Sequence, residues 1–408
     1  MHILIIHQAF AALDEAGGTR HYEMARFLIQ RGHQVTVIAS PISYITGQAH
    51  NGKIPWLEKQ TPEPGITILR CYAYPALHRS FFHRLVNFIS FMLSSFITSL
   101  QVKKVDLVWG TCPPIFQGVT AWLAARLKGI PFLFEVRDLW PKFAIAVGVL
   151  NNPILISLSE WLEKFLYRRA DHCIVNSPGY IDHVTQRGAR NVTLIPNGAD
   201  PDMFTACANG NDLRKKFSFS KDQYLVLYAG AHGLSNDLGI VLQAAKKLAP
   251  QTNIHFLLVG GGKDKPLLIQ QAEEMQLSNL SFLPAMSKTE MPELIAACDA
   301  CIAILKPIED FKTTYPNKVF DYMAAARPVI LAIDGVIRKV VEDAHAGIFV
   351  PPGDPDALAF AILDLSSHPE RGKQMGVAGR LYVEQHFNRA QSASQLASLL
   401  EEMETHHA

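Results

Sequence analysis

Short apolar runs recur along this chain, and most are followed by a stretch whose apolar side chains return at helical spacing. A strand that is apolar throughout is typical of a parallel sheet covered by helices on both faces. This alternation predicts an α/β fold, and its restart in the second half of the chain predicts two sheets. The strand-like runs lie at residues 2–6, 33–40, 66–72, 105–111, 131–141, 172–177, 224–230, 254–262, 281–286, 300–305, 328–333 and 348–358.

Composition sets broad limits on domain count, partners and compartment. A length of 408 residues suggests two or three domains, and a net charge of +1 gives no bulk attraction for nucleic acid. The chain begins directly as a strand, without a basic segment or cleavage site, so we expect no signal peptide and a cytoplasmic location. The six cysteines are scattered, which fits free thiols in a reducing compartment. Cys298 and Cys301 form a CxxC without a second pair or nearby His, which favours core packing over a metal or redox site.

The stretch YPNKVFDYMAAARP at residues 315–328 lies between two strand-like runs and has helical spacing at 318–326. We therefore expect Lys318 and Asp321 in the first turn of a helix at the carboxyl edge of a parallel sheet, where ligands bind. A helix N-terminus beside a Lys favours phosphate, and a carboxylate there can accept hydrogen bonds from sugar hydroxyls. The alternative is an amphipathic helix whose Lys and Asp are only solvated.

Glycine-rich turns follow several of the predicted strands. Glycine lets a ligand approach the backbone and leaves amides free for an anion. Ordinary βα turns also use glycine, but recurrence at successive strand ends favours a phosphate site. The candidate residues in these turns are Gly17, Gly18, Arg20 and His21 in the first unit, and Gly230, His232, Gly233, Gly260, Gly261 and Lys265 in the second.

Two other segments have competing interpretations. Arg137 and Asp138 follow the apolar part of the run at 131–141, and such a pair is costly at a strand end unless it is exposed or functional. It could instead be an exposed ion pair that caps a loop.

The apolar helix at 85–100 is too short to span a membrane and has basic residues at both ends. It is either a core helix or, with its flanks at 79–104, a helix that lies on a membrane surface.

Four motifs together resemble the retaining family 4 glycosyltransferases, which have the GT-B fold. They are PNKVFDYMAA at 316–325, RDLWP at 137–141 followed by GVL.NP, the GG…RH loop at 17–21, and PNGAD at 196–200. The RDLWP phrase is typical of a branch, similar to fucosamine transferases, that makes bacterial envelope polysaccharides. Departures from the family pattern are Asp321 where relatives carry Glu, Ala326 where they carry Gly, Thr313 at a second acidic position, Lys142 where Glu is usual, and Leu234 and Asn236 where Arg and Lys bind pyrophosphate.

The resemblance implies two Rossmann-like domains with a cleft between them. Residues 1–204 would form an acceptor-side domain, 205–221 a linker, 222–385 a nucleotide-sugar domain, and 386–408 a helix that crosses back to the first domain. A polar segment at 41–64 would be a mobile loop near the acceptor. The implied catalytic residues are Asp138, Arg137 and His21. The implied donor-binding residues are Gly17, Gly18, Arg20, Gly230, His232, Gly233, Gly260, Gly261, Lys265, Pro284, Asn317, Lys318 and Asp321.

The implied function is transfer of a sugar, with retention, from a nucleotide sugar to a glycan or polyprenyl-linked sugar during envelope polysaccharide synthesis. A UDP-sugar is the favoured donor, and no metal cofactor is expected, because no carboxylate pair or His/Cys cluster has ligand spacing. The enzyme would act in the cytoplasm, with the inner face of the cell membrane as a possible location. Two alternatives are a nucleotide-sugar epimerase of the same fold and a non-catalytic nucleotide-sugar-binding subunit.

Overall fold

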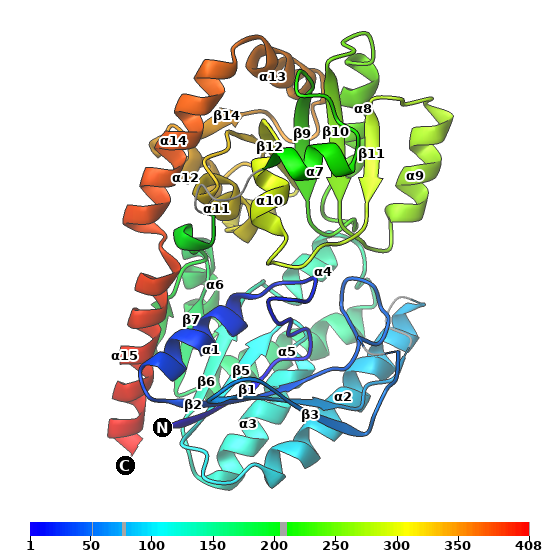
Figure 1. Ribbon diagram of the computed structural model, residues 1–408. Coiled ribbons are helices and arrows are strands. Elements are labelled where there is room, and N and C mark those ends of the chain that lie inside the picture. The colour runs from blue at the N-terminus through cyan, green and yellow to red at the C-terminus, as the bar shows by residue number, and fades with distance from the viewer. Residues whose placement is uncertain (51, 76–78, 205–209, 408) are drawn as a thin grey trace. The chain divides into compact units, whose positions relative to one another are not determined.

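The structure is a computed structural model that describes residues 1–50, 52–75, 79–204 and 210–407. It divides into two compact units. Unit 1 comprises Met1–Leu13, Gly17–Pro196 and Ala390–Ala408, and unit 2 comprises Asp14–Ala16 and Asn197–Arg389. Each unit is built around its own sheet with helices on both faces (Figure 1). The predicted α/β class with two Rossmann-like domains is therefore confirmed.

Unit 1 has an eight-stranded sheet in the order β3-β4-β2-β1-β5-β6-β7-β8, parallel except at its β3 edge. The apolar runs of the sequence supply its centre, because both faces are covered. The strands are β1 His2–Ile6, β2 Gln34–Ala39, β3 Leu57–Glu63, β4 Ile66–Cys71, β5 Leu107–Cys112, β6 Phe132–Val136, β7 His172–Val175 and β8 Val192–Leu194.

Two separate cores lie on the two faces of the sheet of unit 1. Ile3 and Ile5 point to the face covered by α1 and α15, whereas Leu4 and Ile6 point to the face covered by α2, α3 and α5. The helices are α1 Arg20–Gln30, α2 Phe81–Gln101, α3 Phe116–Lys128, α4 Lys142–Ala146, α5 Pro153–Arg169, α6 Ile181–Gln186 and α15 Arg389–His407, with short 3₁₀ turns at Pro178–Tyr180 and Pro201–Phe204, the latter in unit 2.

Unit 2 has a six-stranded parallel sheet in the order β11-β10-β9-β12-β13-β14. Its strands are β9 Tyr224–Ala229, β10 Ile254–Val259, β11 Leu280–Leu283, β12 Ala300–Ile304, β13 Val329–Ala332 and β14 Gly347–Phe349. Its helices are α7 Gly210–Lys216, α8 Leu238–Lys247, α9 Lys265–Glu274, α10 Met291–Ala296, α11 Asn317–Ala324, α12 Val336–Asp343, α13 Pro355–Ser367 and α14 Pro369–His386, with a 3₁₀ turn at Glu309–Thr313.

Helix α2 carries apolar residues on its exposed face as well as on the face that packs on the core. Its hydroxyl-bearing residues face inward: Ser95 and Thr98 are buried, and the Ser95 hydroxyl lies 3.3 Å from the Thr120 hydroxyl of α3. Its large apolar residues form the outward stripe Ile89, Leu93, Ile97 and Leu100, which are 38%, 56%, 45% and 45% exposed. The helix therefore packs on the core through Phe91 and these hydroxyl-bearing residues, and it also turns an apolar stripe to solvent.

Two predicted segments differ from the structure. The loop expected at 41–64 contains β3, which pairs antiparallel with β4 and is polar because it is an exposed edge strand. Of the linker expected at 205–221, residues 205–209 lie outside the described residues, and 210–216 form α7. The Leu213 side chain of α7 is buried in the core of unit 2, so this part of the segment belongs to that unit.

The described cysteines, Cys71, Cys112, Cys173, Cys298 and Cys301, are all buried and free. Both members of the CxxC thus lie in the core, as predicted.

Among the described helices, none combines the length and hydropathy needed to cross a membrane.

Candidate donor and acceptor sites

The glycine turns predicted to bind phosphate come together in unit 2, at the carboxyl ends of β9 and β10. A Cβ atom on Gly260 would lie 1.9 Å from the carbonyl oxygen of Gly230, and one on Gly262 would lie 2.3 Å from that of His232. The His232 amide donates to the Gly261 carbonyl over 2.8 Å. Any side chain at Gly260 or Gly262 would force the two loops apart, so glycine is needed for this close approach.

Lys318 extends its ammonium group toward these loops from the second position of α11. The Nζ atom is buried, lies 3.9 Å from the centroid of the Tyr228 ring, and has no hydrogen-bond partner among the described residues. A Cβ atom on Gly230 would lie 2.6 Å from it. Burial lowers the pKa of Lys318 to about 7. A buried ammonium is costly without a counter-charge, and a bound anion would supply one.

His232 lies beside this lysine and is also without partners. Its ring is fully buried, and neither ring nitrogen has a hydrogen-bond partner in the described part of the chain. Burial, together with the charges of Lys265 and Lys318, lowers its pKa to about 4. The ring is therefore neutral near pH 7 and offers one donor and one acceptor.

Asp321 is the fifth residue of α11 rather than a first-turn residue, which corrects the expectation from sequence. The helix begins at Asn317, so Asp321 lies one turn in, and its side chain leans back toward the N-terminus. One carboxylate oxygen lies 2.6 Å from the ammonium of Lys288, and the other accepts from the amide of Asn317 over 3.3 Å. A carboxylate has about four acceptor positions, so capacity remains for a ligand hydroxyl.

The remaining donor candidates of unit 2 have different surroundings. The ammonium of Lys265 donates to the carbonyls of Gly260 and Leu283, at 2.8 and 2.6 Å, and so ties β10 to β11. Pro284 follows directly and is exposed, and no atom lies near a Cβ built on Gly233. These contacts leave Lys318 as the predicted phosphate ligand with the most open bonding capacity.

Unit 1 contains a buried polar cluster around Glu135, on the face of the sheet covered by α1. Its carboxylate accepts from Arg20 Nε at 2.9 Å, His21 Nε2 at 2.5 Å and Trp109 Nε1 at 3.2 Å. Burial by itself would raise the pKa of Glu135, but His21 and Arg20 hold it below the usual range. The carboxylate is therefore ionised. Arg20 is largely committed to structure, because it also donates to the carbonyls at 195 and 196.

Two histidines of this cluster keep ring nitrogens without partners. His7 follows β1 and is fully buried, with both nitrogens unpaired among the described residues, and its ring centroid lies 4.2 Å from that of His21. His21 Nδ1 is likewise buried and unpaired. Burial lowers the pKa of both rings and Arg137 adds to the effect, and for His21 the net direction stays downward although the Glu135 carboxylate acts to raise the pKa. Both histidines are thus neutral, with hydrogen-bonding capacity left for a substrate.

Arg137 and Asp138 do not pair with each other in the described structure. Arg137 donates to the Thr111 hydroxyl at 2.8 Å and to the Pro113 carbonyl at 2.9 Å. Asp138 is partly buried, and burial raises its pKa to about 6 although Arg137 opposes this. The loop-capping ion pair considered from sequence is therefore not formed, and a carboxyl group that titrates near neutrality remains.

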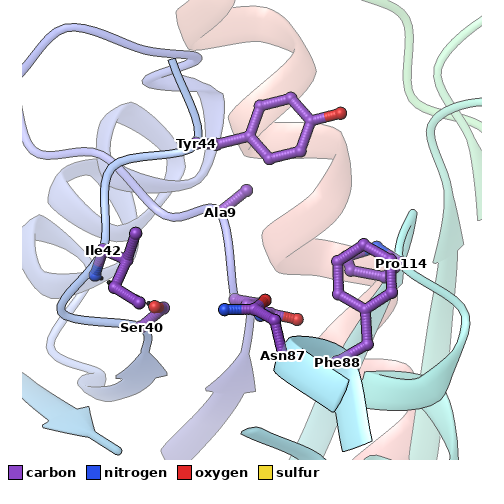
Figure 2. Close-up of a pocket in the computed structure, with 8 residues that line it drawn as sticks. Ala9, Ser40, Ile42, Tyr44, Asn87, Phe88 and Pro114 are labelled. Atoms are coloured by element: carbon purple, nitrogen blue, oxygen red, sulfur yellow. Dashed lines mark hydrogen bonds between the residues drawn. The ribbon is translucent and has the colours of Figure 1, made fainter. Parts of the chain in front are cut away.

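The loop before α1 and a nearby pocket complete the description of unit 1. A Cβ on Gly17 would lie 2.8 Å from the Cβ of Ala11, whereas Gly18 has open space around it. Figure 2 shows a small pocket at the carboxyl ends of β1 and β2, with the side chains of Tyr44 and Phe88 on two of its sides. Its lining residues are Gln8, Ala9, Ser40, Ile42, Tyr44, Asn87, Phe88 and Pro114.

Three polar residues in these sites were missed from sequence: His7, Glu135 and Lys288. Glu135 interrupts the otherwise apolar strand FLFEV, and a charged residue inside a buried strand was a usable signal. His7 directly follows the apolar β1. Lys288 had no such signal, because its partner Asp321 is distant in sequence. Among the described residues, no group of His, Cys, Asp or Glu is arranged to hold a metal ion.

Comparison with known proteins agrees with this architecture. Residues 16–198 match the glycosyl transferase 4-like domain, and residues 223–368 match the glycosyl transferases group 1 domain. A protein of Escherichia coli K12 named as a colanic acid biosynthesis glycosyl transferase, WcaI, is 25% identical over 321 residues, which cover 76% of this chain and 78% of that one.

Solved structures show the same fold. The sucrose-phosphate synthase of Thermosynechococcus elongatus superposes with a TM-score of 0.79 at 19% identity and covers 98% of both chains. The Anabaena protein HepE, solved in complex with UDP and glucose, has a TM-score of 0.74 at 17% identity over 98% of this chain and 100% of that one. The chain therefore belongs to the GT-B glycosyltransferases that join a glycosyl transferase 4-like domain to a glycosyl transferases group 1 domain.

Proposed function

We propose that the protein transfers a sugar from a UDP-sugar, with retention of configuration, to a glycan or polyprenyl-linked sugar during synthesis of a cell-envelope polysaccharide. The similarity to WcaI supports a polysaccharide product, and the fold shared with HepE, which was solved with UDP and glucose, supports the donor class. The RDLWP and PNKVFDYMAA phrases support the retaining outcome through the family they resemble.

The buried ammonium of Lys318 carries this proposal. It lies at the glycine loops of unit 2 with an aromatic ring on one side and no hydrogen bond among the described residues. A diphosphate would give it the missing partner and would accept hydrogen bonds from the loop amides. In this proposal Asp321 and Asn317 bind the ribose, and His232 contacts the diphosphate or the sugar.

The transfer itself needs positioning and charge neutralisation. The bond between the anomeric carbon and the phosphate oxygen breaks, and its electron pair leaves with the nucleotide. An acceptor hydroxyl then bonds to the same face of that carbon and gives up its proton to the leaving phosphate. Lys318 and the amides would stabilise the developing phosphate charge, and Asp138 would orient the hydroxyl or stabilise positive charge on the sugar. This chemistry requires no metal ion.

The acceptor would bind to unit 1. Its pocket combines the aromatic side chains Tyr44 and Phe88, which suit packing against a sugar ring, with the amides of Gln8 and Asn87, which hydrogen-bond to each other. The Asn87 and Phe88 walls belong to α2, and the exposed stripe of that helix begins at the next residue, Ile89. We infer from this continuity that α2 lies on a membrane surface from which a lipid-linked acceptor is drawn.

One experiment tests the function directly. UDP-, GDP- and dTDP-sugars are screened for thermal stabilisation of the protein, and those that bind are assayed for transfer to lipid-linked sugar acceptors in the presence of EDTA. We expect UDP-sugars to bind and turn over, with retained configuration seen by NMR of the product. Donor consumption that does not depend on acceptor would instead support the epimerase, and binding without turnover would support a non-catalytic subunit.

A further inference from the structure

The least expected feature of unit 1 is the ionised carboxylate of Glu135 in the middle of an apolar strand. It is fully buried and receives three hydrogen bonds, one of them a 2.5 Å contact to His21 Nε2. A buried carboxylate is tolerated only when it is paired, so this cluster costs stability that an apolar residue at 135 would not. Packing therefore does not explain why residue 135 is a glutamate.

The bonds of Glu135 decide which nitrogen of His21 carries the proton. A carboxylate can only accept hydrogen bonds, so the neutral His21 ring must donate from Nε2. Its Nδ1 then has a free lone pair, and that atom is buried without a partner among the described residues. A buried acceptor left unpaired in this way destabilises the protein, and a ligand hydroxyl would remove that cost.

We propose that Glu135 is a positioning residue that holds His21 in its Nε2–H form, so that Nδ1 accepts a hydrogen bond from a substrate hydroxyl. The logic is that of carboxylate–histidine pairs in general, in which the second partner fixes tautomer and ring orientation. The ring of His21 contacts two tilted neighbouring rings that restrict its motion, with centroids 4.2 Å away for His7 and 5.1 Å away for Trp109. The expected effect of Glu135 on turnover rests on the proposed transferase function, whereas the expected tautomer of His21 does not depend on that function.

The tautomer can be observed in the wild-type protein. With ¹⁵N-labelled histidine, the signals of His21 are assigned by their loss in His21→Gln. We expect a protonated Nε2 and an unprotonated Nδ1 at pH 7.5. A proton on Nδ1, or on both nitrogens, would overturn the proposal whether or not the protein is an active transferase.

A pair of variants then tests whether the tautomer matters. Trp109→Phe is the control, because it removes one donor to Glu135 and leaves the carboxylate. In Trp109→Phe/Glu135→Gln, the single amide oxygen is claimed by the charged Arg20, and the amide NH₂ faces His21 Nε2. His21 must then accept at Nε2 and carry its proton on Nδ1.

We expect the kcat of the double variant to be about 100-fold lower than that of Trp109→Phe, with the KM for the donor unchanged. A loss of this size is typical when a positioned acid–base group is removed. In a His21→Ala background, Glu135→Gln should have no further effect on kcat. A further loss of kcat when Glu135→Gln is added to His21→Ala would contradict the proposal. An inverted His21 tautomer with unchanged kcat would contradict it too, and Glu135 would then serve only as the counter-charge of Arg20. Donor binding at Lys318 should be the same in all variants, which separates this outcome from failure of the proposed function.

Discussion

At the scale of single residues, Lys318 has the most unusual environment for its charge. Burial lowers its pKa to about 7, and a bound diphosphate would raise it again because the anion favours the charged form. Binding of a UDP-sugar should therefore take up a proton above pH 7. The donor affinity should fall about tenfold per pH unit as the pH rises above 7, until the pKa of the complex is reached.

Titration calorimetry of UDP-glucose at pH 6, 7, 8 and 9 measures this dependence, because its diphosphate does not titrate in that range. The variant Lys318→Met should bind about 10- to 150-fold more weakly and lose the pH dependence, since a hydrogen bond to a charged group contributes about 1.5–3 kcal/mol. His232 stays neutral over this range, so His232→Gln is the matched control and should keep the slope. An affinity independent of pH in the wild type would contradict the role of Lys318.

Asp138 is expected to affect turnover rather than donor binding. Burial raises its pKa to about 6, so the fraction of carboxylate, and with it kcat, should fall as the pH drops through 6. Asp138→Asn should lower kcat and kcat/KM together and remove this acidic limb. A raised folded-state pKa means that ionisation destabilises the native protein as pH rises from about 4 to 6, so the Asn variant should be at least as stable at pH 7. Full activity in Asp138→Asn would leave the protein without its proposed catalytic carboxylate.

Ala326 illustrates a departure from the family pattern that the backbone explains. It follows α11 with a φ of +54°, in the left-handed region that glycine adopts without strain. Ala326→Gly should therefore raise the free energy of unfolding by about 0.5–1 kcal/mol, seen as a higher urea midpoint. The neighbouring Ala325 has a φ of −79°, so Ala325→Gly is the control and should destabilise by a similar amount. A destabilised Ala326→Gly variant would show that the methyl group packs better than the strain costs.

At the scale of elements, α2 presents the most testable surface. Its stripe of Ile89, Leu93, Ile97 and Leu100 is exposed, and Arg79, Lys103 and Lys104, close to its two ends, are exposed as well. Basic residues near an anionic bilayer contribute about 1 kcal/mol each, and the apolar stripe would enter the headgroup boundary. Leu93→Gln/Ile97→Gln should shift the protein from sedimenting anionic liposomes to the supernatant.

The matched control for α2 is Phe360→Gln on α13. Phe360 is 73% exposed, so this change removes a still more accessible apolar side chain from a helix of the other unit. It should leave liposome binding unchanged. If the wild-type protein did not sediment with anionic liposomes, the predicted membrane contact of α2 would be wrong.

The elements also show what the sequence pattern could and could not predict. Buried parallel strands were found because they are apolar on both faces, whereas the edge strand β3 was missed because its exposed, polar sequence resembles a loop. Lys318 was placed correctly near the helix start, but Asp321 was placed in the first turn because the helical spacing was assigned from Lys318, whereas the helix begins one residue earlier, at Asn317. The role of Lys288 depends on a contact between distant segments, which a local pattern does not contain, whereas Glu135 was visible in the sequence as a charged residue inside an apolar strand.

At the scale of the whole molecule, the chain leaves unit 1 at Pro196 and returns to it at Ala390, so α15 is separated in sequence from the unit that it completes. The family resemblance implied that a C-terminal helix crosses back, but its contacts came only from the structure. Leu396 and Leu400 of α15 are fully buried in the core that includes Ile3 and Ile5. Helix α15 therefore completes this core.

The loss of stability on truncating a core leucine of α15 should be confined to unit 1. Leu→Ala in a core costs about 2–5 kcal/mol, so Leu396→Ala should speed hydrogen exchange of the β1 and β2 amides and leave those of β9 and β10 protected. The control Leu381→Ala removes a leucine of α14 that is 52% exposed and should change neither set. Stabilisation by UDP-glucose should persist in Leu396→Ala, because Lys318 and the glycine loops belong to unit 2. If the β9 and β10 amides lost protection as much as β1 and β2, the two units would unfold as one, and the C-terminal helix would stabilise unit 2 as well as unit 1.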